Sequence, residues 1–98
     1  MVIQWTFPAR RDLSAIRSFI AQDSPQYAQK VTTEIVKNSF QLESFPLMGR
    51  KVPEEENESI REILIYSYRL IYETTPDCIL VLAVIHAKRD FSSSFQNS

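Results

Sequence analysis

Cationic side chains and a histidine lie among strand-like hydrophobic residues in the second half of the chain. Arg61 and Arg69 lie in the apolar run of residues 60–72. His86 ends a second apolar run, residues 79–86, and Lys88 and Arg89 follow it. Arginine and lysine bind phosphate and carboxylate groups, and histidine transfers protons near neutral pH. Such residues can bind an anionic partner or substrate, or they can be held in ion pairs within the fold. The elements that position them decide between these two roles.

The first apolar run predicts two antiparallel strands joined at Tyr66 and Ser67. With this turn, Glu62 and Arg69 lie within reach of each other on one face of the sheet. The opposite face, which meets the helices, carries Ile63, Ile65, Tyr68, Leu70 and Tyr72. If Arg69 pairs with Glu62 on an exposed sheet surface, Arg69→Ala should cost no more than about 1 kcal/mol of stability. The alternative is an exposed Arg69 that binds a partner.

The second strand-like run, residues 78–86, is apolar on both faces and predicts a central, covered strand. His86 ends it, either as a satisfied residue at the rim of the sheet or as part of a functional group. Together with Lys88 and Arg89 it would place three hydrogen-bond donors at one strand end, which favours binding of an anion.

The N-terminal half predicts a short strand followed by two amphipathic helices. Apolar residues recur at helical spacing from Pro8 onward. Ser24 is the expected N-cap and Pro25 the first residue of a second helix that continues to Pro46. The two helices should form an antiparallel hairpin. Residues 46–53 contain the only glycine and two prolines, which predicts a loop.

These elements predict an α+β fold in which one sheet packs against the helix hairpin. The N-terminal strand precedes the hairpin, and a three-stranded antiparallel meander follows it. The expected strands cover residues 2–7, 60–65, 68–75 and 78–86. Residues 1–91 form a single domain in this interpretation, and residues 92–98 form a flexible tail.

Length and composition restrict the classes of function. The chain has 98 residues, of which 44% are hydrophobic and 23% charged, and this is typical of one globular domain. No apolar run approaches the roughly 18 residues of a membrane span. The N-terminus lacks signal-peptide features, so a cytoplasmic protein is expected. One cysteine and one histidine are too few for a disulfide or a structural zinc site, and no metal or cofactor is expected.

The charge of the chain is unevenly distributed. Residues 53–58 hold four of the twelve acidic residues, and the remaining eight are outnumbered by eleven lysines and arginines. A mildly basic body therefore carries one acidic loop. Such a run forms either a solvated loop or a surface for partner recognition.

Seven short motifs follow one another along the chain. They are Trp5 with ARRDLSAI (9–16), SP (24–25), FPLMGR (45–50), VPE (52–54), IRE (60–62), YRLIY (68–72) and VIHAKRD (84–90). Their order resembles the RelE/ParE superfamily of toxins from type II toxin–antitoxin operons, nearer to its ParE branch, and covers residues 1 to about 91. The resemblance implies a small sheet that cradles a helical hairpin, and a cognate antitoxin. An amphipathic antitoxin segment would lie in the hairpin groove and at the sheet edge, lined by Leu13, Ile16 and Ile20.

One group within the superfamily consists of nucleases. RelE-like members cleave messenger RNA in the ribosomal A site, with arginines on the phosphate and a general base for the 2′-hydroxyl. The residues that match theirs here are Arg61, Arg69 and His86. Ala87 stands where the histidine-containing subgroup has an aromatic hydroxyl, and Phe91 stands where a tyrosine would donate a proton. These two departures weaken the nuclease interpretation.

The ParE-like members share the His-x-x-Arg-Asp ending found here, and they poison DNA gyrase by binding it. The resemblance therefore favours a gyrase-directed toxin that arrests replication, with a target surface made of His86, Lys88, Arg89 and Arg69. DNA would be contacted only through gyrase or through the toxin–antitoxin complex. The alternatives are an endoribonuclease that acts on ribosome-bound messenger RNA, and a degenerate protein that binds only its antitoxin.

Overall fold

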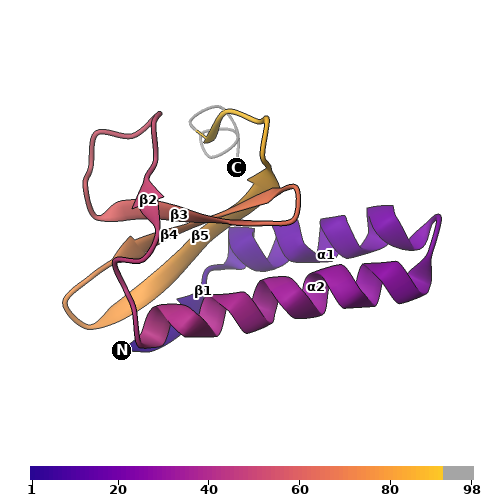
Figure 1. The fold of residues 1–98 in the computed structure, drawn as a ribbon, viewed down its shortest axis with the longest axis horizontal. Coiled ribbons are helices and arrows are strands. Elements are labelled where there is room, and N and C mark those ends of the chain that lie inside the picture. The colour runs from indigo at the N-terminus through magenta and orange to yellow at the C-terminus, as the bar shows by residue number, and fades with distance from the viewer. Residues whose placement is uncertain (92–98) are drawn as a thin grey trace.

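The computed structural model describes residues 1–91, in which two helices pack against one five-stranded sheet (Figure 1). The elements in chain order are β1 (Val2–Trp5), α1 (Phe7–Ala21), α2 (Pro25–Ser39), the 3₁₀ helix η1 (Phe40–Glu43), β2 (Arg50–Lys51), β3 (Ile60–Ile65), β4 (Tyr68–Thr74) and β5 (Cys78–His86). This arrangement confirms the predicted α+β fold class. The expected tail, residues 92–98, lies outside the described residues.

Thr6 ends the first strand and begins the first helix. The sequence predicts a strand that continues to Phe7, whereas β1 ends at Trp5. The Thr6 hydroxyl accepts a hydrogen bond from the Ala9 amide (3.3 Å) and donates one to the Val81 carbonyl (2.8 Å). Thr6 is therefore the N-cap of α1, and it also fastens this helix to β5.

The second helix begins as predicted and ends earlier. Ser24 is its N-cap, since the hydroxyl accepts from the Tyr27 amide (3.1 Å). The prediction that the helix continues to Pro46 is wrong, because α2 ends at Ser39 and η1 follows. The Ser39 hydroxyl donates to the Val36 carbonyl (2.6 Å), a local bond of the kind that competes with regular helix. The tighter winding of η1 keeps Leu42 fully buried.

The strand order is β1-β5-β4-β3-β2, with β1 parallel to β5 and the other neighbours antiparallel. The predicted turn at Tyr66 and Ser67 is confirmed, and Tyr66 adopts a left-handed φ of 55° there. The sequence predicts a loop where β2 forms. This two-residue strand pairs Arg50 and Lys51 with β3, and its two charged residues show none of the alternation that marks a strand.

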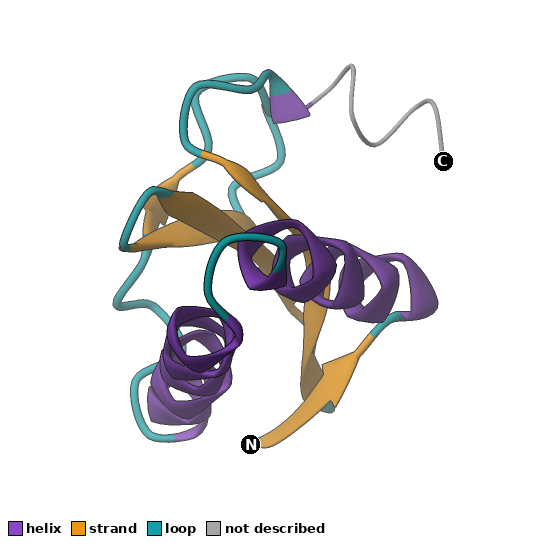
Figure 2. Ribbon diagram, turned by 90° about the vertical axis from the view of Figure 1, so that its right-hand side faces the viewer, coloured by secondary structure: helices purple, strands orange, loops and turns teal. Residues whose placement is uncertain are grey.

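The sheet separates two hydrophobic clusters. The helix-facing cluster contains Ala9, Val31, Ile35, Leu42, Ile65, Leu70, Tyr72, Ile79, Val81 and Val84. The outer cluster contains Val52, Ile71, Leu82, Ala83, Ile85 and Phe91. A register shift after Ile71 leaves Leu82 between the paired residues Val81 and Ala83. Because β5 contributes residues to both clusters, it is covered on both faces, as predicted. Figure 2 views the layers from the end where the two helices connect.

Candidate functional site

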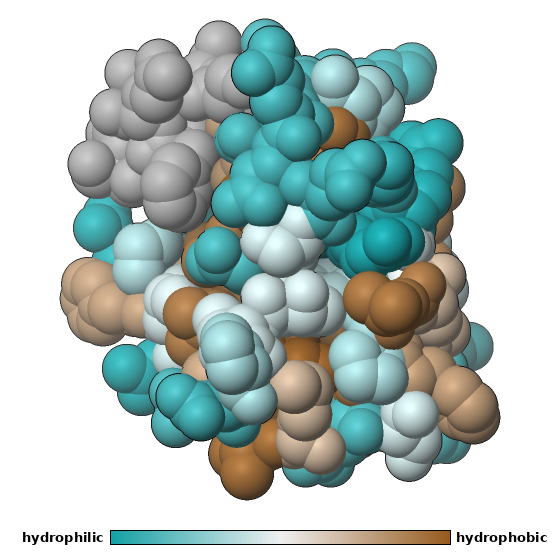
Figure 3. All heavy atoms as spheres, turned by 90° about the vertical axis from the view of Figure 1, so that its left-hand side faces the viewer, coloured by the Kyte–Doolittle hydropathy of each residue, from teal (hydrophilic) through white to brown (hydrophobic). Residues whose placement is uncertain are grey.

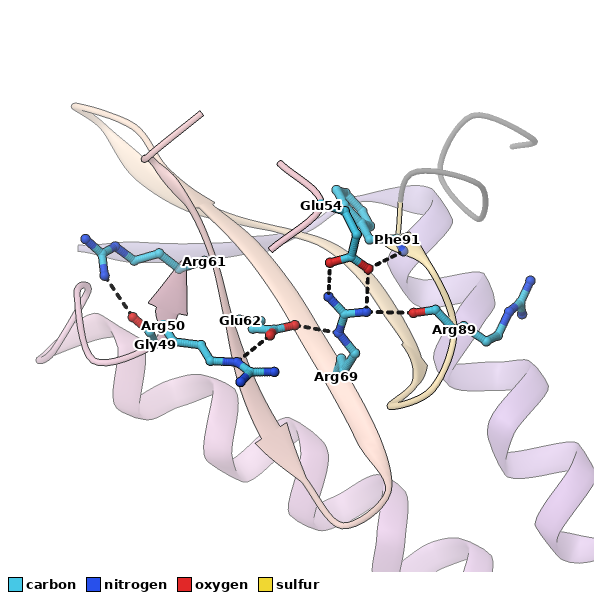
Figure 4. A network of polar contacts seen from close by, with 8 residues as sticks. All are labelled: Gly49, Arg50, Glu54, Arg61, Glu62, Arg69, Arg89 and Phe91. Carbon is cyan, nitrogen blue, oxygen red and sulfur yellow. Dashed lines mark hydrogen bonds and ion pairs between the residues drawn. The ribbon is translucent and has the colours of Figure 1, made fainter. Parts of the chain in front are cut away.

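The arginines of β3 and β4 occupy opposite faces of the sheet. Arg61 is paired with Tyr72 of the helix-facing cluster, whereas Arg69 is paired with Ile85 of the outer cluster. Directly opposed residues of antiparallel strands share a face. Figure 4 shows the two guanidinium groups apart, each with its own partners. They cannot converge on one phosphate.

Arg69 is enclosed by carboxylates. Its Nε donates to Glu62 (2.5 Å), and its terminal nitrogens donate to the two oxygens of Glu54 (2.8 and 2.7 Å). Arg69 and Glu62 are 5% and 1% exposed. The predicted pairing of Arg69 with Glu62 is therefore confirmed. Its expected position on an exposed surface is wrong, because Val52 and Phe91 cover this face of the sheet.

The same guanidinium connects the segment after β5 to the loop after β2. Arg69 Nη1 also donates to the Arg89 carbonyl (2.6 Å), and Glu54 accepts from the Phe91 amide (3.0 Å). The hydrogen bonds from Arg69 lower the pKa of Glu54 to about 2. Glu54 and then Glu62 hold the pKa of Arg69 above its usual value. The network thus fixes the backbone of residues 89–91.

Glu62 binds a second arginine at the edge of this network. Arg50 Nε donates to Glu62 (2.6 Å), while 62% of the Arg50 side chain remains exposed. A cleft of about 410 Å³ lies beside it, lined by Arg50, Pro53, Glu54, Arg69, Ala87, Lys88, Arg89 and Asp90. Because carboxylates already occupy Arg69, the exposed positive charge of this cleft comes from Arg50, Lys88 and Arg89 instead.

The turn after β5 brings His86, Lys88 and Arg89 together, and all three side chains are exposed. The Lys88 amide donates to His86 Nδ1 (3.3 Å), and the Arg89 amide donates to the His86 carbonyl (2.9 Å). The His86 ring meets the edge of Tyr68 with 6.0 Å between ring centroids. Arg69, the fourth residue expected on this surface, lies beneath it with its guanidinium occupied.

The three residues that match the nucleases do not form one site. Arg61 and His86 share the helix-facing side of the sheet, but they pair with Tyr72 and Tyr68, which lie four residues apart on β4. Four residues of strand span about 13 Å. Arg69 lies on the other face. A general base must lie within hydrogen-bond reach of the proton that it removes, next to the phosphate that the arginines would hold. The separation of Arg61, Arg69 and His86 does not allow this.

The Tyr72 side chain is hydrogen-bonded to the segment between η1 and β2. Its buried hydroxyl donates to the Pro46 carbonyl (2.8 Å) and accepts from the Gly49 amide (3.0 Å), while Arg61 donates to the Gly49 carbonyl (2.9 Å). Burial raises the pKa of Tyr72, so the hydroxyl keeps its proton. A Cβ at Gly49 would lie 2.6 Å from the Glu62 carbonyl oxygen and 2.7 Å from the Tyr72 hydroxyl. The only glycine of the chain was the sequence signal for this close approach.

A groove of about 660 Å³ runs between the two helices. It is lined by Arg10, Leu13, Ser14, Arg17, Thr32, Thr33, Val36, Lys37 and Phe40. Of the expected antitoxin contacts, only Leu13 lines this groove. Sequence reasoning did not identify its basic rim, which consists of Arg10, Arg17 and Lys37. Arg10 and Arg17 are seven residues apart, which places them on one helix face.

A second groove of about 270 Å³ lies between α1 and the end of β5. It is lined by Asp12, Ala15, Ile16, Phe19, Tyr68, Val84, Ile85, His86 and Arg89. Leu13, Ile16 and Ile20 all pack against the helix-facing cluster, and Ile16 also lines this second groove. The Asp12 carboxylate accepts from the Val84 amide (3.0 Å), and burial raises the pKa of Asp12 in spite of that bond. The three expected antitoxin contacts thus share one side of α1 but do not line one common groove.

No helix of residues 1–91 is long and apolar enough to cross a membrane. The same part of the chain contains no group of three or more His, Cys, Asp or Glu side chains that could hold a metal ion.

This chain is similar in sequence to toxins and in fold to toxin–antitoxin assemblies. The family described as ParE toxin of type II toxin-antitoxin system, parDE, matches residues 3–91. Toxin RelE2 of Caulobacter vibrioides is 28% identical over 88 residues, which cover 89% of this chain and 96% of that protein. The chromosomal ParDE system from P. aeruginosa has a similar fold, with a TM-score of 0.75 at 22% identity over 90% of this chain and 97% of that chain. The toxin–antitoxin complex RelBE2 from Mycobacterium tuberculosis gives a TM-score of 0.61 at 24% identity over 87% and 95%.

Proposed function

This chain belongs to the ParE toxin family of type II toxin–antitoxin systems, and we propose that it arrests growth by binding DNA gyrase and blocking replication. In this proposal the toxin acts in the cytoplasm through a binding surface and has no nuclease site of its own. A cognate antitoxin neutralises it.

The occupied guanidinium of Arg69 carries the proposal. A phosphate that bound Arg69 would have to displace Glu54, which holds the guanidinium through two hydrogen bonds. It would then lie beside Glu62, a buried carboxylate that repels it. Arg61 and His86 lie on the other face of the sheet and cannot compensate. These contacts support a toxin that acts by binding.

The turn after β5 is the proposed contact with gyrase or with gyrase-bound DNA. His86, Lys88 and Arg89 are exposed there, and the Arg69 hydrogen bond to the Arg89 carbonyl holds their backbone. A basic surface of this kind attracts anionic partners, and most strongly at low salt.

A charge reversal at this turn tests the proposal. The purified parent should inhibit supercoiling by gyrase or trap cleaved DNA, and Lys88→Glu with Arg89→Glu should lower that potency at least tenfold. The matched control is Arg11→Glu with Lys30→Glu, which changes net charge equally on the exposed faces of the helices. Circular dichroism checks that both variants fold. A folded Lys88→Glu, Arg89→Glu variant as potent as its parent would contradict the proposed surface.

The relationship to a toxin named RelE2 favours one alternative, a ribosome-dependent endoribonuclease. Pulse labelling of DNA and of protein after induction separates the two functions. Gyrase poisoning should stop DNA synthesis first and leave ribosome-bound messenger intact. Cleavage of messenger at A-site codons, with DNA synthesis continuing, would replace the proposal with the nuclease function. Arrest of neither synthesis would identify a degenerate antitoxin-binding protein.

The groove between the helices is the proposed antitoxin site. Related structures are toxin–antitoxin assemblies, and this groove combines an apolar floor with a basic rim. It suits an amphipathic segment that carries carboxylates beside its apolar face. Co-expression with the antitoxin should give one complex with a raised melting temperature. Arg17→Glu with Lys37→Glu should weaken that complex, and a pair that elutes separately would contradict the site.

A further inference from the structure

We propose that the exposed tip made of Phe45, Pro46, Leu47 and Met48 is a second docking surface for the antitoxin, on which the segment that leaves the hairpin groove anchors apolar side chains. This inference rests on the proposed antitoxin site in the groove between α1 and α2. It adds a second contact surface on the toxin, and it specifies which residue types the bound antitoxin segment carries.

The tip exposes three large apolar side chains within four residues. Phe45 and Leu47 are each 64% exposed, and Met48 is 49% exposed. Figure 3 views the end of the molecule that carries the N-terminus and the segment between η1 and β2, where brown and tan atoms emerge between teal ones. Clustered apolar exposure of this kind marks interaction sites in small proteins.

The tip is rigidly held although its side chains contribute nothing to either core cluster. The Tyr72 hydroxyl donates to the Pro46 carbonyl within the tip and accepts from the Gly49 amide directly after it, and Arg61 donates to the Gly49 carbonyl. The Met48 amide closes a turn onto the Phe45 carbonyl (3.1 Å). A loop fixed before binding loses little further entropy when a partner docks. Buried polar groups therefore hold exposed apolar ones in a preformed arrangement.

The tip follows the end of the hairpin groove along the chain. Phe40 lines the end of that groove and is also the first residue of η1. The Phe45 amide donates to the Gln41 carbonyl (3.0 Å), so the tip follows η1 without a break. At the 3₁₀ rise of about 2 Å per residue, Phe40 and Phe45 are separated by at most about 10 Å along the axis. An extended segment of three or four residues covers that distance.

Most exposed charges on this path are positive and favour an acidic polypeptide, with Glu43 of η1 as the one exposed acidic residue between the groove and the tip. Arg17 and Lys37 border the groove, and Arg50 and Lys51 follow the tip with 62% and 59% of their side chains exposed. Lys51 pairs with Glu58 (2.7 Å), an exposed contact that a partner carboxylate can replace. Nucleic acid would supply the negative charge but no aliphatic anchors for Leu47. The occupant is therefore an antitoxin segment that alternates apolar residues with carboxylates.

Met48 provides a direct probe, because the chain contains only two methionines. Toxin labelled with ¹³C at the methionine methyl groups is titrated with the antitoxin encoded beside it, and the Met48 signal is assigned with Met48→Leu. The Met48 methyl resonance should shift on binding. Leu47→Ser should weaken antitoxin binding about tenfold, as loss of one interface anchor does. The matched control Leu64→Ser, 57% exposed on β3, should change binding less than twofold.

The outcomes separate this inference from the proposed function. If Lys37→Glu weakens the complex while Met48 stays unshifted and Leu47→Ser binds like the parent, the groove is occupied and the tip inference alone is overturned. If the parent forms no complex, both the groove site and the tip inference fail. If Leu47→Ser abolishes gyrase inhibition at unchanged antitoxin affinity, the tip belongs to the target surface and the inference is overturned.

Discussion

Arg61 and Arg69 lie on neighbouring strands, yet the face that each occupies gives it a different role. Arg61 points to the helix side, where it donates to the Gly49 carbonyl (2.9 Å) and helps to hold an apolar tip. Its Nε is buried and has no hydrogen-bond partner among residues 1–91. Arg69 points to the outer side, where two carboxylates and the Arg89 carbonyl surround it and hold a basic turn. Arg61 therefore has a buried nitrogen without a hydrogen bond in the described part of the chain, whereas all three nitrogens of the Arg69 guanidinium donate hydrogen bonds.

A cation in a strand can thus support a surface without belonging to it. The exposed side chains that these arginines support are Leu47 and Met48 for Arg61, and Lys88 and Arg89 for Arg69. Arg69 fixes its surface through charged partners, whereas Tyr72 fixes the other mainly through neutral hydrogen bonds. Different substitutions should therefore disrupt the two surfaces.

The largest effect is expected for Arg69→Ala. It leaves the buried Glu62 with Arg50, 62% exposed, as its remaining cation, and it removes both of the bonds that Glu54 receives from this guanidinium. The cost in unfolding free energy should therefore exceed that of an exposed pair and reach at most about 3–5 kcal/mol. Arg61→Ala removes one carbonyl bond and one unsatisfied nitrogen, and should cost about 1 kcal/mol. Urea denaturation of both variants measures the difference.

The sequence alone predicts that Arg69→Ala lowers the unfolding free energy by no more than about 1 kcal/mol, as for an exposed ion pair. The larger loss expected from the structure replaces that limit. The correction follows from burial, since Arg69 is only 5% exposed. A loss below that limit would mean that water replaces the guanidinium at little cost. Equal losses for the two arginine variants would remove the contrast between the two faces.

The second largest effect is expected for Tyr72→Phe. This change deletes the hydroxyl that donates to Pro46 and accepts from Gly49, and it leaves the Gly49 amide without that acceptor. The cost should be about 1–3 kcal/mol. Hydrogen exchange at the amides of residues 47–49 should accelerate while exchange at residues 87–91 stays unchanged. Faster exchange in both segments would show that the two surfaces are coupled.

Sequence reasoning located the elements around both surfaces. Alternation in residues 60–72 predicted the hairpin and its two faces, because a period of two assigns each side chain to one face. The pairing of Glu62 with Arg69 followed from that register. The Ser24 cap followed from residue type alone.

The sequence could not predict what the loops bring to these faces. Glu54 reaches Arg69 from fifteen residues away, and residues 53–58 read only as an acidic loop. Tyr72 bonds Gly49 across twenty-three residues, a contact without local periodicity. The burial of Arg69 depends on Phe91, which had been considered only as a departure from a nuclease pattern. Such contacts depend on tertiary packing, which spacing along the chain does not report.

A smaller effect is expected when pH is lowered. Arg69 lowers the pKa of Glu54 to about 2 from 4.5, so the folded protein binds fewer protons than the unfolded chain in that interval. The stability that Glu54 contributes should be complete above about pH 4.5 and should decline as pH falls toward 2. Asp12 has a raised pKa and contributes the opposite slope. The difference between the parent and Glu54→Gln isolates Glu54 in acid titrations followed by urea denaturation. Parallel profiles would show that Glu54 is not held by Arg69 in solution.

The smallest effect is expected for Arg50→Ala, at the exposed end of the same network. Arg50 bonds Glu62 at 2.6 Å, as short as the bonds within the network, but 62% of its side chain lies in solvent. Glu62 keeps its bond to Arg69 when Arg50 is removed, so no buried charge loses its last partner. The cost should therefore be at most about 1 kcal/mol, as for exposed ion pairs, and it should shrink further in salt. Urea denaturation at low and high ionic strength measures it beside Arg69→Ala. A loss that approaches the loss for Arg69→Ala would mean that Glu62 needs both cations, and that the network on the outer face extends to the edge strand β2.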